Sequence, residues 1–403
     1  MLEQLIYTRC KPTINFRDFS QYNGEGFGVF AISSGIADFD EQTRQRIYCV
    51  ICLKNGANEF GRVGLINSYD YYRVNDNTFC MTYETARPYC KEPRKNGLMN
   101  KPGNFIKQSL IGELKGFPYA WFGAATWNAH LIPENDYYHY DDGYSPTFLQ
   151  TVDCVPQRGY ITRKLIHKFV EDGRQEAVKA GIDFLIEELS KDESKRKILL
   201  IKDIPSHVEL WIAAILSALP DFISNEIPFS TNKTRFAYGK YRSVIFYYSD
   251  KRNQLYSPIY NKKKGITKRH PQFMIVGIHP EDPFCHPITQ EENDDYVLVD
   301  GVQKIALFKT NNRISGKFYE DAVVQDDRFL VFRDKILSNI GQLEYISDIR
   351  DLYDFFCREW EICADIKRRE EIVLSACKDY LVNGKPQKYK FKEILKLFGK
   401  TSS

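Results

Sequence analysis

The stretch that decides the fold is Ile198-Leu199-Leu200-Ile201-Lys202-Asp203-Ile204-Pro205-Ser206. Its first four residues are all apolar, which is typical of a short strand that is covered on both faces. Apolar residues then recur at helical spacing from Val208 to Leu216 and predict a helix. Ser206 is expected to cap this helix, with Glu209 completing a capping box. A strand followed directly by a helix is the unit of an α/β region.

The same region continues on both sides of this unit. A helical pattern begins at Thr162, and further apolar strands are expected at 243–248, 273–278 and 296–299. Asp300-Gly301 has the composition of a type I′ turn, so it predicts a hairpin from the last of these strands to 304–308. Residues 157–320 are therefore predicted to form an α/β middle domain.

The flanking segments differ from this region in pattern. Residues 1–156 contain apolar runs at 5–7, 28–32 and 47–53 that are bounded by turn residues, which predicts a strand-rich N-terminal domain. Residues 321–403 carry apolar stripes at helical spacing and predict a helical C-terminal domain. The expected fold class is α+β in these three parts.

Composition limits the classes of protein. The chain has 403 residues, a net charge of +3, and 27 Phe, 26 Tyr and 4 Trp, which indicates a globular protein that does not act through bulk charge. Its ten cysteines lie partly in apolar runs, as is usual for reduced cysteines. Without an apolar run long enough to cross a membrane, or an N-terminal signal peptide, the chain is expected to be cytoplasmic and to have no membrane partner.

Two motifs that resemble cofactor sites are interpreted as structural. Gly24-Glu25-Gly26-Phe27-Gly28 precedes a strand, whereas a phosphate loop precedes a helix, so a tight turn is expected. No P-loop motif occurs, so the chain is not predicted to be a P-loop NTPase. Cys49 and Cys52 are expected to lie on opposite faces of a strand, which argues against zinc. We therefore predict no cofactor and no metal.

Two polar stretches are weak candidates for catalytic sites. The stretch from His279 to His286 follows an apolar strand and combines two imidazoles, two carboxylates and a thiol, although its prolines also suit a rigid exposed loop. Asp141 and Asp142 offer oxygen ligands for a divalent cation, although a solvated loop is the favoured interpretation.

A basic stretch is the candidate for nucleic-acid binding. It contains Lys262, Lys263, Lys264, Lys268 and Arg269, with tyrosines nearby at 247, 248, 256 and 260. Lysines can neutralise phosphates while tyrosines stack on bases, as in grooves that bind single strands. A plain loop between two strands is the alternative, because exposed loops also favour lysine.

An aromatic stretch is the candidate for partner binding. Tyr119, Trp121 and Trp127 lie in or just after Gly116-Phe117-Pro118-Tyr119-Ala120-Trp121-Phe122. Tyr and Trp are the residue types that most often anchor protein interfaces. The alternative is that these side chains fill the core.

Two segments resemble a known family. Residues 2–10 together with Gly26-Phe27-Gly28-Val29 resemble the N-terminal domain of the large GTPase-associated proteins of bacterial NTP-dependent conflict systems. Residues 198–236 resemble the middle domain of that family, with Ala218-Leu219-Pro220 followed by Ile227-Pro228-Phe229-Ser230-Thr231. Pro228, Asn232 and the segment 222–225 differ from the family's usual sequence in this region. The resemblance implies a component of an anti-phage defence operon that works beside a separate GTPase and an effector, and it transfers no catalytic residue.

Two functions follow as expectations. The first is a non-enzymatic scaffold, adaptor or sensor that binds protein partners from its own operon, because no catalytic constellation stands out in the sequence. The alternative is a sensor that binds nucleic acid, or a cryptic metal-dependent hydrolase or nuclease.

Overall fold

The structure is a computed structural model of the chain. The residues that it describes are 1–10, 13–15, 21–22, 26–51, 67–75, 78–86, 105–128, 147–157, 159–189, 191–192, 195–219, 221–232, 245–249, 254–256, 268–271, 273–281, 296–309, 317–337 and 346–383.

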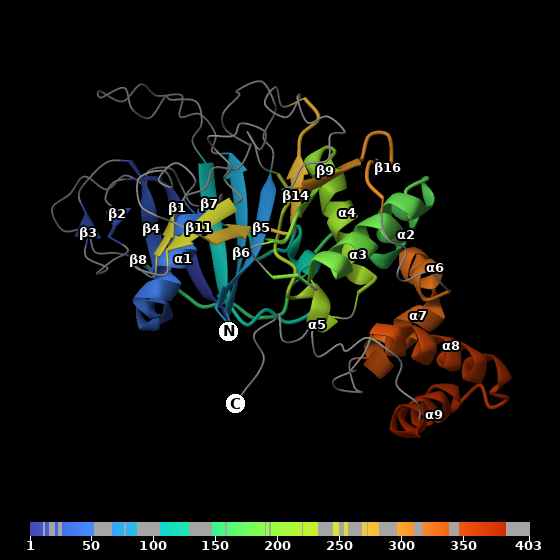
Figure 1. Ribbon diagram of the computed structural model, residues 1–403. Coiled ribbons are helices and arrows are strands. Elements are labelled where there is room, and N and C mark those ends of the chain that lie inside the picture. The colour runs from blue at the N-terminus through green and yellow to red at the C-terminus, as the bar shows by residue number, and fades with distance from the viewer. Residues whose placement is uncertain are drawn as a thin grey trace.

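One mixed sheet of thirteen described strands runs through the molecule from β3 to β16 (Figure 1). Its order is β16-β15-β9-β14-β10-β5-β6-β7-β1-β4-β2-β3, with β8 paired to β4. The strands are β1 (Glu3–Cys10), β2 (Thr13–Ile14), β3 (Gln21–Tyr22), β4 (Gly26–Ser33), β5 (Ser68–Asn75), β6 (Thr78–Ala86), β7 (Phe105–Gly112), β8 (Thr147–Leu149), β9 (Ile198–Lys202), β10 (Phe229–Ser230), β14 (Ile275–Ile278), β15 (Tyr296–Asp300) and β16 (Ile305–Ala306).

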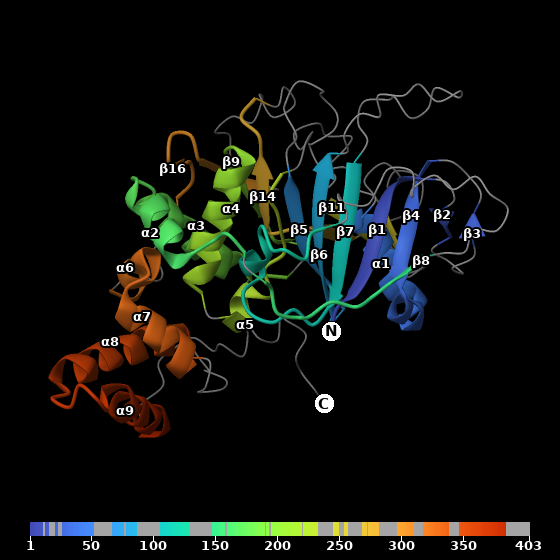
Figure 2. The same cartoon turned by 180° about the vertical axis from the view of Figure 1, so that it is seen from behind.

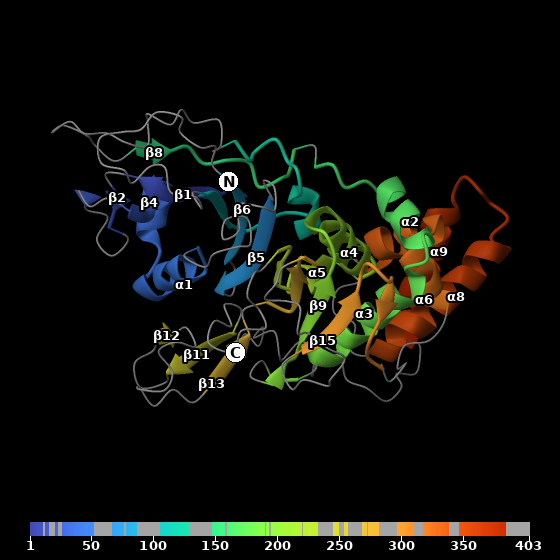
Figure 3. The ribbon, with the colours of Figure 1, turned by 90° about the horizontal axis from the view of Figure 1, so that it is seen from above.

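Helices cover the sheet and extend beyond one end of it (Figures 1 and 2). They are η1 (Ser34–Asp38), α1 (Glu41–Ile51), η3 (Pro118–Trp121), α2 (Arg163–Glu171), α3 (Gln175–Leu189), α4 (Pro205–Ser217), α5 (Asp221–Ser224), α6 (Lys317–Val324), α7 (Asp327–Val331), the π-helical η8 (Phe332–Leu337), α8 (Ile346–Ile362) and α9 (Arg369–Asn383). A small sheet is made of β11 (Ile245–Ser249), β12 (Gln254–Tyr256) and β13 (Lys268–Pro271). Figure 3 shows this sheet and α1 on the same side of β5.

The strand predicted at the centre of the fold is confirmed. β9 lies between the parallel strands β14 and β15, and its residues Ile198 to Ile201 are fully buried. Leu199 and Ile201 belong to one apolar cluster and Ile198 and Leu200 to the other, because successive side chains of a strand point to opposite faces. We call the first face, which packs on α4 and η3, face A, and the second face B.

Two local predictions were wrong. The helix after β9 begins at Pro205 with Ile204 as its N-cap, so Ser206 does not cap it and Glu209 is not part of a capping box. Proline suits the first helical position because its missing N–H needs no partner there. Residues 47–51 are helical rather than extended, because Asp40 starts α1 by accepting from the Thr43 backbone N–H at 2.8 Å.

The α1 helix also changes the argument about zinc. Cys49 lies on a helix, while Cys52 lies outside the described residues. The structure therefore does not support the expectation that Cys49 and Cys52 lie on opposite faces of one strand.

The predicted hairpin at Asp300-Gly301 is confirmed, with a longer loop than expected. β15 pairs with β16 in antiparallel register, Asp300 opposite Ile305, and residues 301–304 form the loop. Lys304 supplies the left-handed conformation, with a φ of 62°.

The α+β class is confirmed, and the sheet is continuous across the boundary predicted between residues 156 and 157. β5 from the first segment pairs antiparallel with β10 from the second, with Asp70 opposite Ser230 and Tyr71 opposite Phe229. The helical segment packs on both of these segments, because the Arg333 guanidinium donates to the Ser217 carbonyl of the second at 2.8 Å and stacks over Phe117 of the first.

A glycine at the centre of the sheet gives a first test. A Cβ on Gly277 of β14 would overlap the Thr231 carbonyl and come within 2.6 Å of Val208. We expect Gly277→Ala to lower the free energy of unfolding by about 2 kcal/mol or more, measured by urea denaturation. In the control Gly181→Ala, the nearest atom is the flexible end of Ile215 at 3.0 Å, and alanine favours the helix. A change within about 1 kcal/mol is expected there, and equal losses in both variants would contradict the argument.

Candidate functional site

Of the weak catalytic candidates, only His279 lies among the described residues. His279 lies half-buried just after β14, and its Nδ1 accepts from the Glu281 backbone N–H at 3.1 Å. His286, Asp141 and Asp142 lie outside the described residues, as do Lys262, Lys263 and Lys264.

The aromatic candidates lie mostly in the core, so for Trp121 and Trp127 the structure supports the alternative of core packing over an exposed partner surface. Trp121 is fully buried and Trp127 is 5% exposed, and the Trp127 indole N–H donates to the Trp121 carbonyl at 2.7 Å. The short helix η3 turns Trp121 onto face A, where Trp127 also packs against Tyr69. Tyr119 is partly buried, and burial raises its pKa to about 12. Neither indole is accessible for direct contact with a partner.

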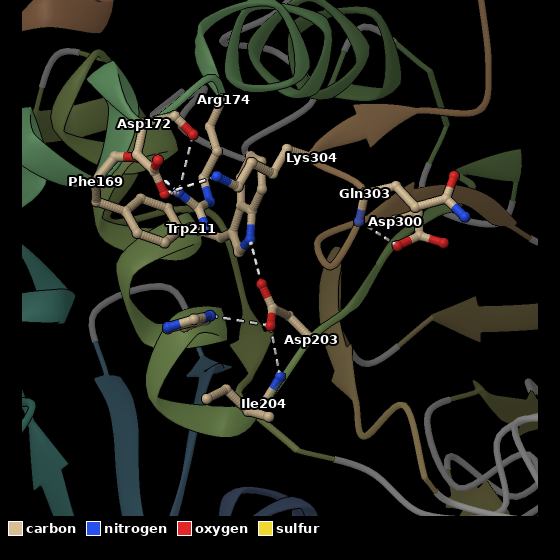
Figure 4. Close-up of polar contacts among 10 residues, drawn as sticks. Phe169, Asp172, Arg174, Asp203, Ile204, Trp211, Asp300, Gln303 and Lys304 are labelled. Atoms are coloured by element: carbon tan, nitrogen blue, oxygen red, sulfur yellow. Dashed lines mark hydrogen bonds and ion pairs between the residues drawn. The ribbon is translucent and has the colours of Figure 1, made fainter.

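The carboxyl ends of the parallel strands β10, β14, β9 and β15 meet at one edge of the sheet, next to the start of α4. Asp203 follows β9 at this edge and is 3% exposed. Its carboxylate accepts from the Ile204 backbone N–H at 2.8 Å and from the Trp211 indole N–H at 3.1 Å, and lies 3.1 Å from His207 Nδ1 (Figure 4). Gly301 packs directly against it, so a Cβ there would lie 2.5 Å from Oδ2.

A stacked arginine connects this edge to the segment between α2 and α3. The Arg174 guanidinium lies 4.2 Å from the Phe169 ring centroid and donates to Asp172 at 2.6 Å (Figure 4). The Lys304 ammonium donates to the same Asp172 oxygen at 2.8 Å. These two hydrogen bonds, from Lys304 first and then Arg174, lower the pKa of Asp172 to about 2.

The chemistry available at this edge is that of an oriented imidazole. Asp203 fixes the ring of His207, whose side chain is 41% exposed, and such a pair can accept a proton. Within the described ranges, however, no group of three or more His, Cys, Asp or Glu side chains is placed to hold a metal ion. The sequence signal for the pair is the spacing of Asp203 and His207 at the strand end, which by itself indicates only the start of a helix.

A second arrangement, which the sequence pattern did not predict, lies on face B. Eight adjacent positions carry polar side chains in two rows across the sheet, seven of them on four strands and Asn232 just after β10, and each is at most 1% exposed. We call them the polar block: Ser230, Asp70, Thr82 and Ser109 in one row, and Asn232, Ser68, Glu84 and Lys107 in the other.

Register places these side chains next to one another. Asp70 pairs with Ser230 and Thr82, and Thr82 with Ser109. The contact of β10 with β5 continues beyond the strand, because the Thr231 backbone N–H donates to the Tyr69 carbonyl at 2.8 Å. Asn232 therefore lies opposite Ser68 and on the same face.

Part of the polar block is bonded internally. The Lys107 ammonium lies 3.1 Å from the Glu84 carboxylate, and the hydroxyls of Thr82 and Ser109 are 2.8 Å apart. In contrast, the amide of Asn232 and the hydroxyls of Ser68 and Ser230 are buried and have no hydrogen-bond partner in the described structure.

Three of the ten exposed large apolar side chains in the described structure lie close together in the chain. Ile362 is 67% exposed, Ile366 75% and Ile372 41%, all around the turn that joins α8 to α9. Figure 2 shows this turn far from β3, at the other end of the molecule. We call these three residues the isoleucine tip.

The tip stands on a well-packed base. Tyr353 on α8 packs against Phe332 with ring centroids 4.8 Å apart, and its hydroxyl donates to Asp321 at 2.8 Å. Trp360 packs on Phe356 at 5.3 Å. The helix α8, which ends at Ile362, is thus fixed by aromatic packing along its length.

The basic candidates that the structure describes lie in the small sheet. Lys268 and Arg269 of β13 pair in register with Tyr248 and Tyr247 of β11, and Tyr247 also pairs with Tyr256 of β12. The ladder therefore brings the predicted basic and tyrosine positions together.

Comparisons with known protein families, curated proteins and solved structures find no match to this chain. Among the described helices, none is both long enough and apolar enough to cross a membrane.

A buried acid on α4 gives a test of the electrostatics beside the carboxyl edge. Glu209 accepts a hydrogen bond from the Tyr160 hydroxyl, and burial raises the pKa of its carboxyl to about 7 although this bond opposes the rise. Between pH 4.5 and 7 the folded protein keeps a proton that the unfolded chain has lost. This group's contribution to stability is therefore largest at low pH and is lost as the pH rises through 7.

We expect wild type to lose about 3 kcal/mol relative to Glu209→Gln as the pH rises from 4.5 to 8. Urea denaturation of both proteins across this range measures the difference, and the glutamine variant is expected to be the more stable at pH 8. A constant difference at all pH values would show that Glu209 titrates normally.

Proposed function

We propose that this chain is a non-enzymatic scaffold or sensor of a bacterial conflict system, which acts in the cytoplasm with a separate GTPase and an effector. The resemblance in residues 2–10 and 198–236 supports the setting. The observation that carries the proposal is the isoleucine tip, three large aliphatic side chains exposed at and beside the turn that joins α8 to α9.

Exposure at the tip has a physical cost that a partner would remove. Each isoleucine leaves apolar surface in water, and clustered apolar surface on a monomer marks a site of protein contact. Tyr353 and Trp360 already order α8 by packing. Binding of a partner would therefore cost little conformational entropy at the tip.

The test is capture of the GTPase encoded in the same operon. We expect the double variant Ile362→Ser/Ile366→Ser to weaken its binding by about tenfold or more, because it removes the apolar anchors. The melting temperature should stay within a few degrees, since both side chains are exposed.

Val302→Ser is the matched control, because Val302 is 61% exposed on the hairpin loop, away from the tip. It should bind like wild type. Unchanged binding of the double variant would show that the tip is not the interface.

A second function has its own observation. Register in the small sheet places Lys268 opposite Tyr248 and Arg269 opposite Tyr247, and a combination of basic and aromatic residues is typical of sites that bind single-stranded nucleic acid.

We expect Lys268→Ala/Arg269→Ala to weaken binding of a fluorescent single-stranded RNA and to reduce the salt slope of log K by about 0.7 for each phosphate that these side chains neutralise in wild type. Fluorescence anisotropy at several salt concentrations measures both. If wild type shows no salt-dependent binding, the chain is not a nucleic-acid sensor of this kind.

A further inference from the structure

We propose that the polar block on face B binds the adenine base of a nucleoside or nucleotide, with Asn232, Ser68 and Ser230 as the recognition groups. This site is separate from the isoleucine tip and does not depend on the proposed protein partners.

The first step is the free-energy cost of burying the polar block without hydrogen-bond partners. Asn232 is 1% exposed, Ser68 and Ser230 are fully buried, and the polar atoms of their side chains have no hydrogen-bond partner in the described structure. A buried polar group without a partner costs about 1–3 kcal/mol. Adjacent groups of this kind on one sheet face are therefore best explained by a bound molecule that supplies their partners.

The second step is spacing. Asn232 and Ser68 are opposite each other on paired backbones, and Ser230 lies two residues before Asn232 on the same face. Cross-strand neighbours have Cβ atoms about 5 Å apart, and next-but-one residues of a strand are about 7 Å apart. Three groups at this spacing can contact one planar ring system.

The third step is charge. The block contains two carboxylates, Asp70 and Glu84, against the single ammonium of Lys107, which already pairs with Glu84. This balance disfavours a phosphate or a carboxylate within the block. It favours a neutral ligand part that donates and accepts hydrogen bonds.

The fourth step is the chemistry of the amide. Asn232 presents a donor and an acceptor side by side in one plane. Adenine offers the complementary pair, an amino donor beside a ring-nitrogen acceptor, and asparagine is a standard bidentate partner for it. The hydroxyls of Ser68 and Ser230 can donate or accept, so they can serve the remaining ring nitrogens.

The test is isothermal titration calorimetry of the full chain with adenosine, ATP, guanosine and ribose. Adenosine or ATP should bind, guanosine should bind at least about tenfold more weakly, and ribose should not bind. If adenosine and ATP bind equally, the base alone is recognised, whereas tighter ATP binding indicates that phosphates are contacted outside the block.

Two variants distinguish recognition from packing. We expect Asn232→Leu to weaken binding of the adenine ligand at least about tenfold and Ser230→Ala about threefold or more. Without ligand, Ser230→Ala should melt no lower than wild type, because it removes an unpartnered hydroxyl. The control Ser224→Ala, which removes a buried hydroxyl that donates to the Leu216 carbonyl at 2.6 Å, should lower the melting temperature and leave affinity unchanged.

Three results would overturn the proposal. The first is no heat from adenosine or ATP up to millimolar concentration, which would leave ordered water as the partner of these groups. The second is equal affinity for guanosine and adenosine. The third is that both single variants, Ser230→Ala and Asn232→Leu, bind the adenine ligand with wild-type affinity. If Asn232→Leu does not fold, wild-type affinity in Ser230→Ala is sufficient to overturn the proposal.

Discussion

The rest of the structure depends on the pairing of β10 with β5. Tyr71 opposite Phe229 and Asp70 opposite Ser230 join strands that are far apart in the chain, so a mainly antiparallel N-terminal part and a mainly parallel α/β part form one sheet. Phe229 and Tyr71 lie on face A and stack with ring centroids 5.3 Å apart. Ser230 and Asp70 lie on face B, where the apolar surface changes to the polar block. One short contact thus sets both the core and the candidate ligand site.

The parts of the fold that follow from local pattern could be predicted from the sequence. Ile198 to Ile201 identify a buried strand because four apolar residues need cover on both faces. The apolar run from Ile47 is ambiguous, since a buried strand and a buried helix look alike over so short a length. Asp40, which lies outside the run and caps the first turn, decides in favour of a helix.

The candidate sites were harder to predict, for a reason that concerns register. Ser68 and Asp70 alternate with tyrosines, as do Thr82 and Glu84 around Tyr83, and such alternation indicates a strand with one wet face. In the structure both faces of these strands are buried, so the polar positions face one another instead of water. That relation depends on the pairing of distant segments, which a local pattern cannot show. For a related reason the sequence left Trp121 open between core and interface, because its burial depends on how η3 packs on face A.

The position of the polar block gives a physical reason to connect ligand binding with partner binding. Asn232 and Ser230 belong to the segment that joins the two parts of the main sheet. A molecule bound there would therefore stabilise this junction by RT ln(1 + [L]/Kd). The parallel strands of the main sheet pack on α4, and the carbonyl of its last residue, Ser217, accepts a hydrogen bond from Arg333. Arg333 lies in η8, next to Phe332 of the aromatic base of the tip. A chain of packed elements therefore runs from the block to the tip. Coupling through it requires that the ligand favour one of two arrangements of these elements, so adenine should change partner affinity only if the junction itself has two states.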